Sequence, residues 1–397
     1  MFETISTAPP DAILGLNEAF QQDQRPEKIN LSVGVYRDDS GETPILQCVR
    51  AAEQKWLAEQ SSKSYLGIEG LTAYRRFVVQ LLFGEAVNRE HLAVLQTPGG
   101  TGGVRLAAEF VATQFAGSRV FVSNPTWANH HAIFNAAGLA TVPYRYVNQN
   151  RTGLDFAGLC DDLDSQTIPG DAVLLHACCH NPTGVDPTPQ QWQQLGELLA
   201  RRRLLPILDF AYQGFGAGLE EDAEGLRTVL RHCPELLVCS SFSKNFGLYG
   251  ERVGAMTLVA ADQASATACM SQLKCLVRAN YSNPPQHGAA LVTTIAGDPE
   301  LSAQWRLELA EMRQRIRHMR QQFVDQMAAS GVDRDFSFLL QQRGMFSFSG
   351  LNPLQVDRLR SEHAVYIVGS GRINVAGMTA ENLPRLCQAV AAVLADA

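Results

Sequence analysis

The stretch Ser241-Phe-Ser-Lys244-Asn-Phe-Gly247-Leu-Tyr-Gly250-Glu-Arg252 decides how the chain is interpreted, and the apolar run Leu236-Leu-Val-Cys-Ser240 leads directly into it. The run predicts a buried strand that opens into a loop at Lys244. Poor hydration there and the nearby charge of Arg252 both favour the neutral amine of the lysine. A neutral amine is able to attack a carbonyl group and form a Schiff base.

The residues around Lys244 are suited to binding a phosphate. Ser241 and Ser243 offer hydroxyl donors, and Arg252 offers a two-pronged guanidinium. A lysine nucleophile beside a phosphate site is the combination that pyridoxal 5'-phosphate (PLP) requires. The alternative is that Lys244 is an ordinary surface lysine beside a loop, and this stretch alone leaves both interpretations open.

The composition argues against several classes of protein. The chain has 397 residues, 46% of them hydrophobic and 18% charged, which is typical of a globular protein of about two domains. A formal net charge of -7, with no basic cluster beyond residues 201–203, argues against a nucleic-acid-binding protein. No run approaches the roughly 18 apolar residues of a membrane span, and no secretion signal follows Met1. Nine scattered cysteines are typical of reduced thiols, so we expect a cytoplasmic protein.

From about residue 93 onwards, short apolar runs alternate with helical patterns. Five predicted strands are each followed by a segment rich in glycine or polar residues, namely 97–103, 124–130, 178–184, 210–215 and 241–252. The alternation predicts an α/β fold, with a mostly parallel sheet flanked by helices. Because such sheets bind ligands at the carboxyl ends of their strands, we expect the five segments to form one site.

The two ends of the chain depart from this alternation. Asp11 is the predicted N-cap of a short helix that ends near Phe20, residues 29–36 alternate like a strand, and residues 299–329 predict a long helix. The tail after about residue 330 mixes strand-like pieces with two helices. We expect a large domain over residues 46–310 and a small α+β domain built from both ends. Residues 1–45 would supply an N-terminal arm and part of the small domain, and residues 311–397 would supply the rest.

Two motifs allow more than one interpretation. The glycine cluster 99–103 is suited to binding a phosphate at the start of a helix, with a hydroxyl from Thr101. It matches neither a dinucleotide fingerprint nor a P-loop. The run His176-Ala-Cys178-Cys179-His180 would place three ligands on one strand face, but zinc sites draw their ligands from separated pairs. We therefore expect packing there and no metal.

Isolated polar residues at the strand ends also have alternative roles. Asp209 ends an apolar strand, where an unpaired carboxylate is costly, so it must cap a group or pair with a cation. Trp127 is suited equally to a core position and to stacking on a ligand ring. Arg278 and Arg372 are either partners in surface ion pairs or binding groups for carboxylates.

Six segments together resemble the class I PLP-dependent aminotransferases, most closely the bacterial aspartate and aromatic amino acid aminotransferases. They are residues 97–102, 178–184, 209–215, 241–254, 280–285 and 371–377, and the resemblance runs from about residue 10 to the end of the chain. It implies the fold-type I arrangement, a PLP cofactor and a homodimer whose active site is shared between the subunits.

The resemblance also implies a role for each site residue. Lys244 would form the Schiff base with PLP and later move a proton, and Asp209, supported by His130, would pair with the pyridine nitrogen. Tyr212 and Asn181 would hydrogen-bond a ring oxygen, and Trp127 would stack on the ring. The phosphate would be bound by Gly100, Thr101, Ser241, Ser243 and Arg252, and by Tyr65 of a second subunit. The substrate α-carboxylate would be bound by Arg372 with Asn181, Trp127 and the backbone of Gly34. Arg278 of the second subunit would bind a side-chain carboxylate.

The reaction that this resemblance implies is a ping-pong transfer of the amino group of L-aspartate to 2-oxoglutarate. Transfer from tyrosine or phenylalanine, or dual specificity, is the alternative, because aromatic-accepting relatives keep such an arginine. Two arginines placed for two carboxylates argue against PLP lyases and decarboxylases, and the missing glycine fingerprint argues against a nicotinamide oxidoreductase. We expect small-molecule substrates and neither nucleic acid nor membrane as partners.

Overall fold

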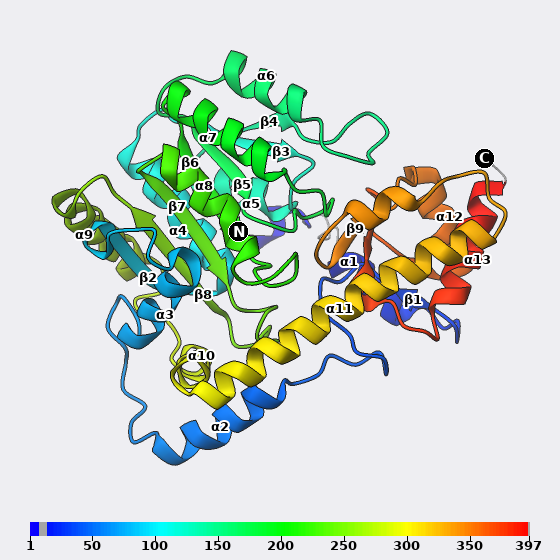
Figure 1. Cartoon of the computed structure of the whole chain (residues 1–397), viewed down its shortest axis with the longest axis horizontal. Helices are drawn as coiled ribbons and strands as arrows, with labels where there is room; N and C mark the ends of the chain where they lie inside the picture. Colours follow the sequence, from blue (N-terminus) through cyan, green and yellow to red (C-terminus); the bar gives the residue numbers. More distant parts are fainter. Residues whose placement is uncertain (8–13, 396–397) are drawn as a thin grey trace. The chain divides into compact units, whose positions relative to one another are not determined.

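The structure is a computed structural model that describes residues 1–7 and 14–395 (Figure 1). The chain forms two compact units, a central unit of Pro44–Gln314 and a terminal unit of Met1–Thr43 with Arg315–Ala397. The predicted N-cap Asp11 lies outside the described residues, and the described part of the helix that follows it is α1 (Leu14–Gln22).

The central unit is built on a seven-stranded sheet in the order β2-β8-β7-β6-β5-β3-β4. In chain order the strands are β2 (Leu92–Pro98), β3 (Val120–Asn124), β4 (Thr141–Arg145), β5 (Ala172–His176), β6 (Leu205–Phe210), β7 (Leu236–Ser241) and β8 (Val253–Val259). β8 is antiparallel to both of its neighbours, whereas the other adjacent pairs are parallel. The predicted, mostly parallel α/β sheet is therefore confirmed.

Two strands of this sheet were not predicted. β8 follows the loop after β7 without an intervening helix, so it returns antiparallel and breaks the alternation of strand and helix. β4 pairs only with β3 at one edge of the sheet, and most of its residues are partly or fully exposed. The apolar signal that marks the fully buried β5 and β7 is therefore weak in β4.

The central unit also contains helices, several of which pack on the sheet. In chain order the helices are α2 (Gln47–Glu59), α3 (Thr72–Phe83), α4 (Gly99–Gln114), α5 (Asn129–Ala136), α6 (Phe156–Gln166), α7 (Pro189–Arg202), α8 (Glu224–His232), α9 (Gln263–Asn280), α10 (His287–Gly297) and the first part of α11 (Pro299–Ala329). α4 packs against β2, β7 and β8, while α7 packs against α6 and α8 (Figure 1). α7 begins after Thr188, which forms a capping box with Gln191, and ends at Arg203, which has a left-handed conformation.

The terminal unit joins the two ends of the chain. Its strands form two small sheets, β1 (Ile29–Asn30) parallel to β10 (Val365–Tyr366), and β9 (Phe346–Phe348) antiparallel to β11 (Arg372–Asn374). The second part of α11, α12 (Pro353–His363) and α13 (Leu383–Ala395) are its other main helices.

The strand predicted over residues 29–36 is wrong beyond Asn30. The Asn30 carboxamide oxygen accepts hydrogen bonds from the backbone N–H and the hydroxyl of Ser32. The Asn374 carboxamide nitrogen donates to the carbonyl oxygens of Val33 and Val35. These side-chain bonds take the place of a strand ladder.

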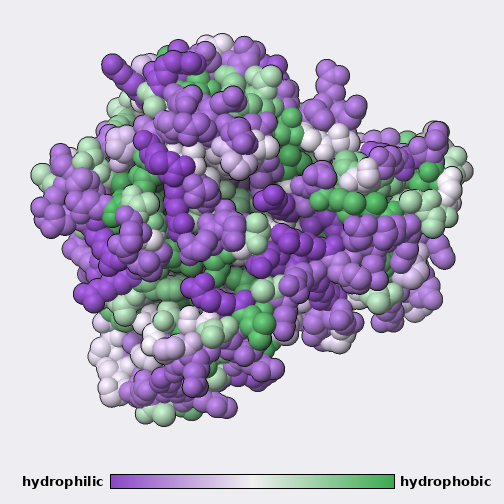
Figure 2. Space-filling model, in the orientation of Figure 1, coloured by the Kyte–Doolittle hydropathy of each residue, from purple (hydrophilic) through white to green (hydrophobic). Residues whose placement is uncertain are grey.

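The face of the molecule in Figure 2 is mainly hydrophilic, with apolar residues in small groups. Among the helices of the described residues, none combines the length and the apolar character needed to span a membrane.

Candidate active site

The five predicted site segments lie along one side of the central sheet, the side where the carboxyl ends of its parallel strands meet (the site edge). β2, β3, β5, β6 and β7 all run in the same direction, so their carboxyl ends meet at that edge. β8 runs in the opposite direction and therefore starts there, directly after Arg252. The antiparallel strand thus brings Arg252 to the same edge as Lys244.

Lys244 lies half-buried in the loop that follows β7. Burial lowers the pKa of its amine to about 8; Asp209 raises this pKa and Arg252 lowers it. The Lys244 Nζ lies 5.0 Å from the centre of the Tyr212 ring. The structure therefore provides the poorly hydrated lysine that the sequence predicted, with an appreciable neutral fraction near neutral pH.

Asp209 is buried near the end of β6 and pairs with His130, which is buried in α5. Its Oδ2 lies 3.0 Å from His130 Nε2, and the Nδ1 of that ring lies 2.8 Å from Thr126 Oγ1. Burial by itself raises the pKa of Asp209, but the hydrogen bond from His130 and nearby positive charge outweigh it and leave the pKa below its ordinary value. This strand end therefore carries a carboxylate that stays ionised.

Two further histidines extend this cluster, and the sequence assigned neither to the site. His176 ends β5 beside Asp209 in the sheet register, and its ring centre lies 5.2 Å from that of His130 and 4.2 Å from that of His180. His180 is bonded to Ser123 and Thr183 and stacks on Tyr146. The sequence did contain a signal for His176, because this histidine lies at the carboxyl end of an apolar run that predicts a buried strand.

The expectation that His176, Cys178 and His180 would share a strand face is wrong. β5 ends at His176, and Cys179 has a left-handed conformation (φ 51°). Cys178 and Cys179 group with Asp222, not with the histidines. The Asp222 carboxylate already accepts hydrogen bonds from the backbone N–H groups of Gly214, Gly216 and Ala217.

The glycine cluster forms the first turn of α4 and not a separate loop. The N-cap residue Pro98 makes no side-chain hydrogen bond to this helix start, so the first N–H groups of α4 are suited to binding an anion. A Cβ at Gly99 (φ +75°) would lie 2.5 Å from Arg252 Nη2, and one at Gly100 would lie 2.9 Å from Ser241 Cβ. Because glycine leaves this space open, Arg252 and Ser241 come close to the helix start, and the resulting donor set fits a phosphate group.

The other predicted residues of the central unit fall into two groups. Asn181 and Tyr212 are buried after β5 and β6, and Trp127 is half-buried with its ring edge-on to His130, 5.1 Å away. Tyr65, between α2 and α3, is 91% exposed, and Arg278 is exposed in the last turn of α9, bonded to Ser282. The first group therefore lies at the edge that carries Lys244, whereas Tyr65 and Arg278 reach into solvent from this single chain.

Gly34 and Arg372 lie in the terminal unit. Arg372 is buried at the start of β11, donates a hydrogen bond to the Ser32 carbonyl oxygen, and lies 4.2 Å from the centre of the Phe346 ring. The segment around Gly34 passes the same ring, since a Cβ at Gly34 would lie 2.7 Å from Phe346 Cζ. The terminal unit thus brings these two predicted residues to the same aromatic side chain.

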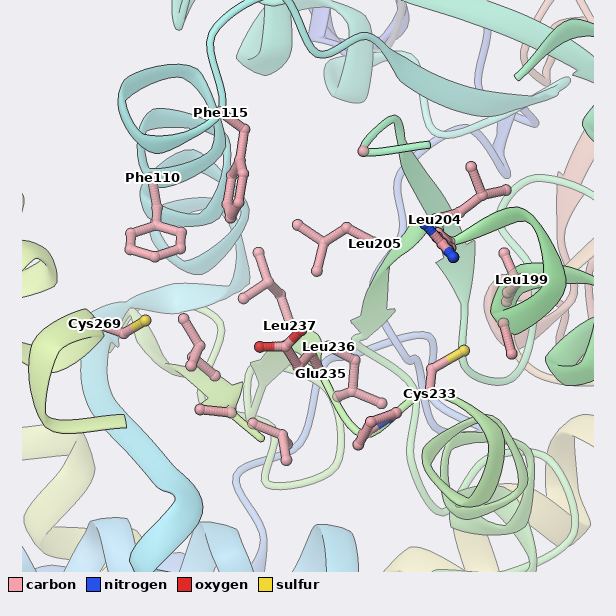
Figure 3. A pocket seen from close by; sticks show the side chains of 17 residues that line it. Phe110, Phe115, Leu199, Leu204, Leu205, Cys233, Glu235, Leu236, Leu237 and Cys269 are labelled. Atoms are coloured by element: carbon pink, nitrogen blue, oxygen red, sulfur yellow. The ribbon is translucent and has the colours of Figure 1, made fainter. Parts of the chain in front are cut away.

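A separate hollow of about 340 Å³ lies at the opposite edge of the sheet (Figure 3). It is lined by the first residues of β6 and β7 and by apolar side chains such as Phe110, Leu199 and Leu204. None of the predicted site residues lines it.

Comparison with known proteins gives consistent matches over the whole chain. The family model for aminotransferase class I and II matches residues 26–390. An aspartate aminotransferase of Salmonella typhi is 54% identical over 99% of this chain and 100% of its own length. An aromatic-amino-acid aminotransferase of Pseudomonas aeruginosa is 46% identical over 100% of this chain and 99% of its own length.

A solved structure agrees with these matches. The aromatic-amino-acid aminotransferase of Burkholderia pseudomallei, covalently bound to pyridoxal phosphate, superposes with a TM-score of 0.96 at 46% identity, covering 99% of both chains. This match confirms the fold-type I arrangement that the sequence resemblance implied. The chain belongs to the aminotransferases of class I and II.

Proposed function

We propose that the protein is a PLP-dependent transaminase that transfers the amino group of L-aspartate to 2-oxoglutarate, giving oxaloacetate and L-glutamate in two half-reactions. The observation that carries this proposal is that the parallel neighbours β6 and β7 bring the buried Asp209 and the half-buried Lys244 to the same end of the sheet. Asp209 stays ionised there, and burial lowers the pKa of Lys244. The names of similar proteins support the choice of substrate. Three aspartate aminotransferases are 51–54% identical to this chain and two others are 46% and 42% identical, while aromatic and tyrosine aminotransferases are 44–46% identical.

The residues at this edge fit PLP, which when bound supplies an electron sink for negative charge at the substrate α-carbon. The start of α4 with Gly100 and Thr101 would bind the phosphate, together with Ser241, Ser243 and Arg252. Asp209 would hold a proton on the pyridine nitrogen, and the His130 N–H bond keeps that carboxylate in place. Asn181 and Tyr212 would bind the ring oxygen, and Trp127 would lie against the ring face.

Lys244 has the properties of a proton carrier. With a pKa of about 8, its amine both accepts and releases a proton near neutral pH, which is the condition for efficient general acid–base catalysis. The 5.0 Å contact of its Nζ with the Tyr212 ring limits where the amine lies. We therefore propose that Lys244 binds PLP and then moves the proton at the substrate α-carbon.

Arginines would select the substrate. Arg372, with the backbone near Gly34, would bind the α-carboxylate, aided by Asn181 and Trp127. Arg278 of a second copy of the chain would bind the side-chain carboxylate, and Tyr65 of that copy would reach the phosphate. Both side chains are exposed in a single chain, which supports a homodimer with a shared site.

We also propose that the central unit is the PLP-binding domain and that the terminal unit contains the small domain and the N-terminal arm. A cytoplasmic location is supported by the nine cysteines, all of which lie in the described residues and form no disulfide there.

The experiment is a half-reaction without 2-oxoglutarate. Purified holoenzyme is mixed with aspartate, and we expect oxaloacetate in an amount equal to the active sites; later addition of 2-oxoglutarate should release glutamate. The same measurement with phenylalanine tests the aromatic alternative. The similarity of this chain to aromatic aminotransferases is the reason to include it. Equal rates with both amino acids would replace the aspartate proposal by dual specificity, and no keto acid from either would overturn the proposed transaminase.

A further inference from the structure

Trp305, on α11, contacts the main chain next to Lys244. Its indole ring is fully buried, and Nε1 donates a hydrogen bond of 2.7 Å to the carbonyl oxygen of Asn245. The ring also stacks on Phe246, with centres 4.3 Å apart and planes at 11°. The two residues that follow Lys244 are therefore both held by one side chain.

The same helix also contacts the loop that carries Tyr212. Arg313 Nη1 donates a hydrogen bond of 2.8 Å to the carbonyl oxygen of Gly214. The two loops are joined to each other, because the Asn245 carboxamide donates to the carbonyl oxygen of Gln213 at 3.3 Å. α11 thus anchors both loops whose side chains meet where Lys244 Nζ lies over the Tyr212 ring.

We propose that Trp305 is a positioning residue that fixes the Lys244 amine through its hydrogen bond to the Asn245 carbonyl oxygen. A buried carbonyl that loses its donor must find another partner or water. The loop would then move, and the Lys244 amine would gain access to water. This inference rests on the proposed role of Lys244.

The simpler interpretation is that Trp305 only fills the core. The two interpretations differ in the effect that removal of the N–H group alone has on the reactivity of the Lys244 amine.

Trp305→Phe removes the N–H group and keeps a ring that is able to stack on Phe246. Trp56→Phe is the matched control, because the buried Trp56 Nε1 has no hydrogen-bond partner among the described residues. For each variant, PLP is added to the apoenzyme and the capture rate is followed against pH, since only the neutral amine of Lys244 reacts. The kcat and KM for aspartate and the melting temperature of the apoenzyme are measured alongside.

We expect Trp305→Phe to raise the pH midpoint of PLP capture towards that of an ordinary lysine. We expect kcat to fall about tenfold, since small misplacements of a catalytic group cost up to about 100-fold, with KM changed less than about twofold. Trp56→Phe should leave the midpoint and kcat unchanged. A lower melting temperature with wild-type midpoint and kcat in Trp305→Phe would overturn the proposal and leave Trp305 a core residue.

Phe246→Leu tests the same point with the indole N–H in place. It removes the stacked ring, so we expect a lower melting temperature but a wild-type capture midpoint. A midpoint shift as large as that of Trp305→Phe would show that packing, and not the hydrogen bond, positions Lys244. If wild type uses phenylalanine in place of aspartate, the substrate proposal fails, but the differences in PLP capture between variants still test Trp305.

Discussion

Burial acts on Lys244 and His176 in the same direction, because both side chains are charged when protonated. It lowers the pKa of Lys244 to about 8 and the pKa of His176 to about 3. The position of Lys244 could be predicted from the sequence, since a lysine directly after an apolar strand is poorly hydrated. The surroundings of His176 could not, because the ring of His130 reaches it from α5, which is distant in the sequence, and the ring of His180 reaches it from the turn after β5.

His176 should make the folded protein sensitive to acid. Its ring nitrogens have no hydrogen-bond partner in the described part of the chain, and its folded pKa of about 3 lies below the ordinary 6.5. The unfolded chain therefore binds the proton first, so stability is full above pH 6.5 and is lost as the pH falls from there towards 3. Between pH 7 and pH 5 this loss amounts to about 2 kcal/mol of unfolding free energy.

His176→Phe should remove that part of the acid sensitivity, which urea unfolding at pH 7 and pH 5 would measure. His318, which is exposed on α11, provides the comparison: His318→Phe should leave the loss between the two pH values nearly as in wild type. Equal losses in wild type and His176→Phe would contradict the prediction.

Asp209 should be needed for catalysis as an anion and not merely as a polar group. Asp209→Asn keeps the size of the side chain but cannot hold a proton on a pyridine nitrogen by charge. We expect kcat to fall by about 10²–10⁴-fold, as for the loss of a positioned proton-handling group. Steady-state kinetics with saturating PLP would measure the loss.

Asp171→Asn is the matched control, because Asp171 is also buried and pairs with Arg119 in front of β5, away from the site edge. It should lower stability and leave the kcat of the folded protein unchanged. A comparable fall of kcat in both variants would mean that Asp209 serves only the fold.

At the scale of helices and strands, the sequence predicted those elements that have a clear apolar periodicity. The strands β2, β3, β5, β6 and β7 and the bounds of α11 follow from the apolar alternation and from helical spacing. β4, β8 and the early end of β1 could not be predicted in this way. The direction of β8 depends on a returning loop, and β1 ends where the side chains of Asn30 and Asn374 bond the backbone.

The close packing of β8 against the start of α4 predicts which glycine near Lys244 cannot be replaced without loss of stability. A Cβ at Gly254 would lie 2.4 Å from the backbone carbon of Gly99, whereas one at Gly250 would meet nothing within 4 Å. Gly254→Ala should therefore push β8 away from the start of α4, destabilise the fold by about 1–3 kcal/mol, and weaken PLP binding. Gly250→Ala should be nearly neutral in both respects. Thermal unfolding of the apoenzymes and titration with PLP would compare them, and equal PLP affinities would contradict the prediction.

At the scale of the whole molecule, the sequence resemblance predicts roles for residues that a single chain does not explain. Strand order and the position of Lys244 follow from the single chain, but Tyr65 and Arg278 are exposed on it and gain a role only in a symmetric pair. Their proposed role came from the resemblance to the family, since no packing pattern in the sequence indicates a second copy.

Mixing two inactive variants tests whether the site is shared. Lys244→Ala removes the lysine, and Arg278→Ala removes the arginine that a second copy would supply. In a hybrid dimer, the site with the intact Lys244 would receive the intact Arg278 from the other subunit. After joint refolding of equal amounts, random pairing would restore about a quarter of the wild-type activity towards aspartate. The control is a mixture of Lys244→Ala with Arg372→Ala, because Arg372 should serve the site of its own chain, so no hybrid would hold a complete site. Activity equal to the sum of the separate variants in the first mixture would contradict the shared site, and recovery in the second would place Arg372 in the site of the other subunit.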